Sequence, residues 1–214
     1  MNVDLAVYAI VATLSPLGFA ATLAVLASGR LRALLFAAAF VVAQFAAVAL
    51  LTIVDVALWP GAGESSHVRE LVELAIGVLL VAAGLIVWLR GGPAQGDDTH
   101  SALDRLRGLG PSAALAGGAL LGVGGPKRLV LSAVAATAIG ESGGNELGLA
   151  VVYTAIATLL VWAPVVLFVA LGERALGWLQ SGQAWLGGRR RVLATASLVV
   201  VGALAIGDSL VALL

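Results

Sequence analysis

The feature that most constrains this chain is a series of long apolar stretches separated by short polar segments. Hydrophobic residues make up 61% of the 214 residues and charged residues only 11%, whereas a soluble domain needs a largely polar surface. About 20 apolar residues are enough to cross a bilayer as one helix. Six stretches are of about that length or longer: 5–28, 33–59, 71–89, 113–139, 147–171 and 192–214. We therefore predict an all-α membrane protein with six transmembrane helices.

The basic residues are sorted between the two ends of these predicted helices. Nine arginines lie in the segments that follow helices one, three and five, whereas the segments on the other side contain only Arg69. The nine are Arg30, Arg32, Arg90, Arg105, Arg107, Arg174, Arg189, Arg190 and Arg191. Since basic segments stay on the cytoplasmic side, we expect a multi-pass protein of a bacterial inner membrane with both termini extracytoplasmic.

An internal similarity divides the chain into halves. SPLGFAATLAVLASG (15–29) and GPKRLVLSAVAATAIG (125–140) each place a proline near the middle of a predicted helix, followed by small and aliphatic residues. Three helices in each half mean that the second half enters the membrane from the opposite side. We predict two inverted three-helix repeats, 1–90 and 111–214, joined by a cytoplasmic linker, 91–110. Transporters built in this way bind their substrates near the midplane, where helices break.

Two adjacent cations lie at the centre of predicted helix four. They are Lys127, the only lysine of the chain, and Arg128, and they follow Gly124, Gly125 and Pro126. The nearest apolar end is roughly 18 Å away, further than a lysine stem can reach. A charge at the bilayer centre costs about 2.5–3.5 kcal/mol on the insertion scale. We predict that these five residues bind an anion or lipid headgroup, with a structural ion pair as the alternative.

Other predicted helices supply further candidates. Ser15 and Pro16 would form the matching break in helix one, for which a simple proline kink is the alternative. Gln44, near the centre of helix two, could bind substrate or join helices by hydrogen bonds. Asp55 and Asp208 lie toward the outer ends of helices two and six, either as groups that couple transport to a proton or ion or as interfacial caps.

Two further patterns predict packing. Gly118 and Gly122 are one helical turn apart and allow close contact with another helix. Segment 172–191 places Trp178 and Trp185 near one helical face before three arginines. That pattern is typical of a short interfacial helix on an anionic leaflet, and an ordinary loop with tryptophans at headgroup depth is the alternative.

The sequence lacks the motifs of most soluble enzymes, metal-binding proteins and nucleic-acid-binding proteins. The chain has no cysteine, no HExxH or P-loop motif, and no nucleophile–base set in a supporting context. His67 and His100 lie in polar segments on opposite sides, so they cannot share a metal. The arginines lack the interleaved aromatic residues of a nucleic-acid surface. We expect no enzyme activity, no cofactor, no metal and no nucleic-acid partner.

The motifs resemble a known family. SPLGFAATLAVL in helix one and GGPKRLVLSAVAATAIG in helix four are similar to the LysE superfamily of six-helix exporters, and most of all to its branch of glycopeptidolipid- and sulfolipid-addressing proteins. An asparagine is expected before the Pro-Lys pair in that branch, where this chain has Gly125. The resemblance implies export or flipping of an envelope lipid or glycolipid by alternating access in an actinobacterium, with membrane lipids and an anionic lipid substrate as partners.

Two alternatives remain open at the level of the sequence. One is a LysE-type exporter of a small amino acid or an ion. The other is a non-transporting membrane scaffold within a lipid-export complex. A larger envelope-lipid export machinery and a homo-oligomer are each compatible with the sequence.

The arginine distribution makes a first testable prediction. A reporter that is active only in the cytoplasm should be silent when fused after Leu214, whereas one that is active only outside should give signal there. The same two reporters inserted near Arg105 serve as the control and should give the reverse pattern. A cytoplasmic signal from the Leu214 fusion would contradict the predicted orientation.

Overall fold

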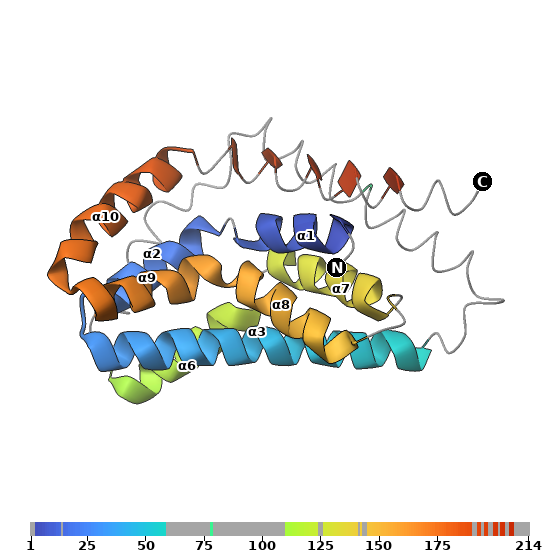
Figure 1. The fold of residues 1–214 in the computed structure, drawn as a ribbon, viewed down its shortest axis with the longest axis horizontal. Coiled ribbons are helices and arrows are strands. Elements are labelled where there is room, and N and C mark those ends of the chain that lie inside the picture. Colours follow the sequence, from blue (N-terminus) through green and yellow to red (C-terminus); the bar gives the residue numbers. More distant parts are fainter. Residues whose placement is uncertain are drawn as a thin grey trace.

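The described part of the chain is helical. The computed structural model describes residues 3–13, 15–58, 78, 110–123, 126–140, 142 and 145–189, with short helical pieces between 192 and 207. Over this part there is no strand, which confirms the all-α class (Figure 1). The helices are α1 (Val3–Thr13), α2 (Pro16–Leu26), α3 (Arg30–Leu58), α6 (Pro111–Val123), α7 (Pro126–Gly140), α8 (Glu146–Ala157), α9 (Leu159–Leu171) and α10 (Glu173–Gly188). Predicted helix three, most of helix six and nearly all of the linker lie outside the described residues.

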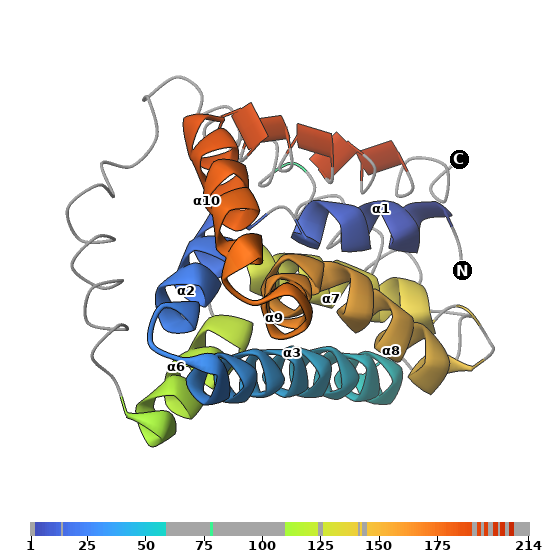
Figure 2. The same cartoon turned by 60° about the vertical axis from the view of Figure 1, so that its left-hand side comes forward.

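Helix α3 is the longest of the described helices and runs the length of the bundle (Figures 1 and 2). Its 29 residues span about 43 Å at 1.5 Å per residue. Its sequence contains neither glycine nor proline, so every turn can keep its backbone hydrogen bonds. Among the described helices, α3 is the one that is long and apolar enough to cross a bilayer by itself. If each bent helix pair also counts as one span, the described residues contain up to four spans.

The segments predicted as helices one, four and five are each bent helix pairs; the breaks at Pro16 and Pro126 agree with the sequence, whereas the break within 147–171 corrects the prediction of an unbroken helix there. The pairs α1–α2, α6–α7 and α8–α9 bend by 50°, 61° and 68°. Pro16 and Pro126 are the first residues of α2 and α7, because proline lacks an N–H and fits the first turn of a helix better than its interior. The third break falls at Thr158, whereas Pro164 lies inside α9.

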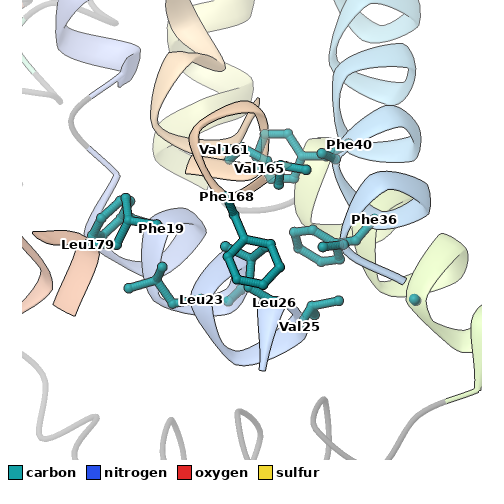
Figure 3. Close-up of a cluster of buried hydrophobic side chains, with 14 of the residues drawn as sticks. Phe19, Leu23, Val25, Leu26, Phe36, Phe40, Val161, Val165, Phe168 and Leu179 are labelled. Atoms are coloured by element: carbon teal, nitrogen blue, oxygen red, sulfur yellow. The ribbon is translucent and has the colours of Figure 1, made fainter. Parts of the chain in front are cut away.

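The buried apolar side chains form two clusters. Figure 3 shows the first, in which Phe19 of α2, Phe36 of α3 and Phe168 of α9 lie together, with Leu179 of α10 beside Phe19. The second joins α1, α3, α7 and α8 through residues that include Tyr8, Val48, Leu131, Ile139 and Tyr153. The helix breaks separate the two clusters. Of each bent pair, α2, α6 and α9 contribute to the first cluster, and α1, α7 and α8 contribute to the second.

Helix α6 packs directly on the backbone of α3 through glycine. A Cβ added to Gly118 would collide with the carbonyl of Phe36, and one added to Gly122 would lie 2.5 Å from Phe40 O. Both contacts are closer than real Cβ atoms allow, which confirms the predicted close helix contact at these glycines. Since 118 pairs with 36 and 122 with 40, the two helices run in the same direction.

This pairing gathers several arginine-bearing segments at one end of the bundle. Helix α6 begins beside the start of α3, and the guanidinium of Arg30 lies 5.7 Å from the ring centroid of Phe168, near the end of α9. Gly172 ends α9 with a φ of +63°, which favours glycine, and the chain turns into α10. Arg30, Arg32 and Arg174 therefore lie at the same end, as their sorting in the sequence requires. The side of the membrane that this end faces stays a prediction.

The α3–α6 contact makes a second prediction. Gly118→Ala should lower the free energy of unfolding in detergent by about 1–3 kcal/mol, because the added methyl group overpacks the contact with a backbone carbonyl that cannot rotate away. Gly177→Ala in α10 is the matched control, since a Cβ there meets nothing within 4 Å and alanine favours a helix. Equal stability of the two variants in thermal unfolding would contradict the close packing.

Candidate functional site

The three helix breaks lie together against the middle of α3. Arg128, two residues after Pro126, places its guanidinium carbon 4.5 Å from the ring centroid of Phe40. Gly18, two residues after Pro16, is also near this ring, since an added Cβ there would lie 3.8 Å from Phe40 Cζ and 3.4 Å from Val161 in α9. The starts of α2, α7 and α9 are therefore at one level of the bundle.

Arg128 is the centre of a buried polar cluster at this level. Its side chain is only 9% exposed. Nη1 donates to Gln44 Oε1 at 3.1 Å, and Nη2 lies 3.5 Å from the carbonyl oxygen of Ala157. A guanidinium over an aromatic face is attracted by the ring quadrupole, so Phe40 covers the cation while two neutral oxygens accept from it.

Gln44 connects this cation to the next turn of α7. Its Nε2 donates to Ser132 Oγ at 2.8 Å, and Ser132 Oγ donates to the carbonyl oxygen of Arg128 at 2.9 Å. Arg128 has only donors and so requires Oε1 of Gln44 to face it, which fixes the amide orientation. Since Gln44 is 1% exposed, its amide must find its hydrogen-bond partners within the protein, and Arg128 and Ser132 supply two of them.

The last turn of α8 receives donors from three different helices. A helix end leaves its final carbonyl groups without backbone partners. Trp162 Nε1 donates to Ala155 O at 2.9 Å, the hydroxyl of Thr13 lies within hydrogen-bonding distance of Ile156 O, and Arg128 reaches Ala157 O. Side chains of α9, α1 and α7 thus satisfy three successive carbonyl groups at the break.

The cluster carries a positive charge without an acidic partner among the described residues. No ion pair to Arg128 is found there, and its two side-chain hydrogen bonds go to an amide and a backbone carbonyl. Arginine has five N–H donors, so the cation retains donor capacity. Thr154 Oγ1, one turn before the break, is also buried without a hydrogen-bond partner in the described chain.

The structure brings together only some of the predicted site residues. Arg128 and Gln44 are in direct contact, and Ser15 caps α2 by accepting from Gly18 N at 3.4 Å. Pro16 and Pro126 begin their helices.

Other predicted site residues are only partly described. Lys127 is the second residue of α7 and Asp55 lies near the end of α3, but their side chains are outside the described part. Gly124, Gly125 and Asp208 lie wholly outside it.

Several residues of the cluster carry no distinctive sequence signal. Ser132 could have been found, because it lies four residues after Arg128 and therefore on the same helical face. Thr13 and Ala157 could not, because their roles depend on a break at Thr158 that no proline or glycine marks. Phe40 could not either, because tertiary packing places its ring beside Arg128. Among the searched residues, no group of acidic, histidine or cysteine side chains could hold a metal ion.

This geometry defines a class of protein: an all-helical membrane bundle in which helix breaks surround a buried cation. The chain belongs to the family described as Sap, sulfolipid-1-addressing protein, whose family model matches residues 5–211. This match confirms the resemblance to the lipid-addressing branch drawn from the sequence motifs. No curated protein and no solved structure matches the chain.

Removing one of the three donors to α8 gives a third prediction. Thr13→Val should lower the free energy of unfolding by about 0.5–1.5 kcal/mol, because it removes a side-chain hydrogen bond to the partly buried carbonyl of Ile156. Thr22→Val is the matched control: Thr22 is fully buried, but its hydroxyl bonds only Gly18 O of its own helix at 2.8 Å. Thermal unfolding in detergent measures both, and equal losses would show that the α8 carbonyl needs no such donor.

Proposed function

We propose that this protein exports or flips an envelope lipid with an anionic headgroup, and that Arg128 holds that headgroup at mid-membrane. The observation that carries the proposal is a buried guanidinium without a carboxylate partner among the described residues, at the level where three spans break. Membership of the sulfolipid-1-addressing family supports a lipid as the cargo. A sulfated lipid supplies the negative charge that the cluster lacks.

The chemistry of the cluster suits an oxyanion. The planar guanidinium can donate two parallel hydrogen bonds to a sulfate, phosphate or carboxylate group. Away from water these charge interactions are strong. The N-termini of α2 and α7 begin at this level, and their free N–H groups and dipoles add positive potential. Acyl chains would stay in the surrounding lipid while the headgroup crosses.

The remaining sequence candidates complete the proposed site. Lys127 directly precedes Arg128, and with Gly124, Gly125 and Pro126 it would form the wall at the break of predicted helix four. The break after Ser15 and before Pro16 would face it from the other half. Asp55 and Asp208 remain the proposed groups for coupling to a proton or ion.

An inverted repeat with alternating access is part of the proposal. The first and the fourth predicted helix each break just before a proline. In each, the residue two positions after the proline, Gly18 or Arg128, lies beside the ring of Phe40. Helix α6 runs parallel to α3, whereas α2 reaches α3 through the short turn at Gly29 and so runs against it. Opposite directions are what inverted halves require. The counterpart of the unbroken α3 would be the bent pair α8–α9, so the halves differ there.

A scaffold without transport activity is the second candidate. It is favoured by the bond between Arg128 and Ala157 O, since a cation that caps a broken helix has a structural role whether or not a substrate binds. The two functions differ in how they respond to a competing anion beside Arg128.

The fourth prediction places that anion next to the cation. Gln44→Glu keeps the side-chain shape and puts a carboxylate oxygen where Oε1 now accepts from Arg128. A tethered carboxylate competes at an effective concentration of about millimolar or higher, so flipping of a fluorescent sulfated glycolipid in reconstituted vesicles should fall about tenfold or more. The thermal stability should stay near that of the wild type, because the new charge pairs with Arg128 and offsets the lost bond from Gln44 Nε2 to Ser132 Oγ.

Gln180→Glu provides the matched control, because it adds the same charge at an exposed position of α10. It should flip the sulfated lipid as the wild type does. A stable Gln44→Glu protein with undiminished flipping would show that Arg128 is structural only, and would contradict the proposed site. Absence of any flipping by the wild type would favour the scaffold.

A further inference from the structure

Helix α10 has an exposed aromatic and basic face that the Arg128 site does not use. Arg174, Trp178, Ser181, Trp185 and Arg189 are all exposed, and Trp178 and Trp185 are 70% and 53% exposed. Arg189 directly follows Gly188, the last residue of α10, and the spacing of four, three, four and four residues keeps the five on one side of the helix and its end. We name these five residues the α10 stripe.

The adjacent face of α10, about 90° around the helix from the stripe, packs on the protein. Ala175, Leu179 and Leu186 are buried in the first apolar cluster, and a Cβ added to Gly182 would lie 3.7 Å from the ring of Phe19 in α2. Figures 1 and 2 show α10 crossing the direction of α3 near the end where α3 begins. A helix that crosses the spans at the end of a bundle lies where the bilayer surface would be.

The chemistry of the stripe is that of lipid headgroups. Tryptophan prefers headgroup depth, where its ring is apolar and its N–H is wet. Arg189 stacks 4.5 Å above the ring of Trp185, so the charge is held beside the aromatic surface. The single acid of α10, Glu173, is one residue from Arg174 and points about 100° away on the helix. The sequence continues with Arg190 and Arg191.

We propose that the α10 stripe binds anionic phospholipid headgroups of the adjacent leaflet. The two arginines pair with phosphates while Trp178 and Trp185 enter the headgroup layer. Because α10 packs on α2, this contact would hold α2, whose first residue lies at the helix breaks, at a fixed depth. The stripe lies outside the Arg128 site, so its lipid binding does not depend on export.

The test compares lipid binding by the full-length protein in detergent micelles. Titration with phosphatidylglycerol, followed by the rise in melting temperature, should give a lower affinity for Arg174→Gln/Arg189→Gln, by about fivefold for each arginine removed. Phosphatidylcholine should bind both proteins equally. High salt should reduce the phosphatidylglycerol effect in the wild type, since exposed charges are screened.

Charge and folding are controlled separately. Arg174→Lys/Arg189→Lys keeps both charges and should keep most of the phosphatidylglycerol preference. If the double glutamine variant unfolds in neutral micelles, Arg174→Gln alone should still show about a fivefold loss. Equal phosphatidylglycerol affinity of the wild type and the glutamine variants would overturn the proposal. So would a dimer of the wild type that the variants lose, because the stripe would then bind a second copy.

Discussion

The fold depends on how the carbonyl groups at a helix break find hydrogen-bond donors in the water-free interior of a bilayer. A bilayer gives an unpaired backbone carbonyl no partner, so irregular backbone survives there only inside protein or beside a polar cavity. At the end of α8 the carbonyls of Ala155, Ile156 and Ala157 receive donors from Trp162, Thr13 and Arg128. These donors come from α9, α1 and α7, so a single break fixes how three helices meet. The straight helix α3 and the glycines of α6 supply the rigid frame.

Arg128 is the member of this set that links structure to chemistry. Threonine and tryptophan offer one donor each, whereas arginine has five and carries a charge. Phe40 and Gln44, both on α3, hold the guanidinium against the unbroken helix. The bundle therefore keeps a cation at the level of its breaks without a carboxylate among the described residues. A cation so placed costs free energy, and an anionic substrate would offset that cost.

The sequence predicted the parts of this site that depend on composition and local chemistry. Long apolar stretches indicated the helices, prolines at 16 and 126 indicated two breaks, and Gly118 with Gly122 indicated a close helix contact, whose partner α3 the structure supplies. The break at Thr158 was not predicted, because it follows from which side chains of other helices can reach the freed carbonyls. The same holds for Phe40 and Thr13, whose side chains are ordinary in an apolar helix until tertiary packing places them.

The proposed function has a physical consequence for the bent pair α8–α9. An anionic headgroup that pairs with Nη1 and Nη2 of Arg128 would compete with Gln44 Oε1 and Ala157 O for these two donors. Gln44 would keep its bond to Ser132, to which its Nε2 donates at 2.8 Å. Ala157 O has no second side-chain donor among the described residues, and so the bend at Thr158 loses one of its three side-chain restraints when the site is filled. Binding at Arg128 and the angle between α8 and α9 would then be coupled through one hydrogen bond.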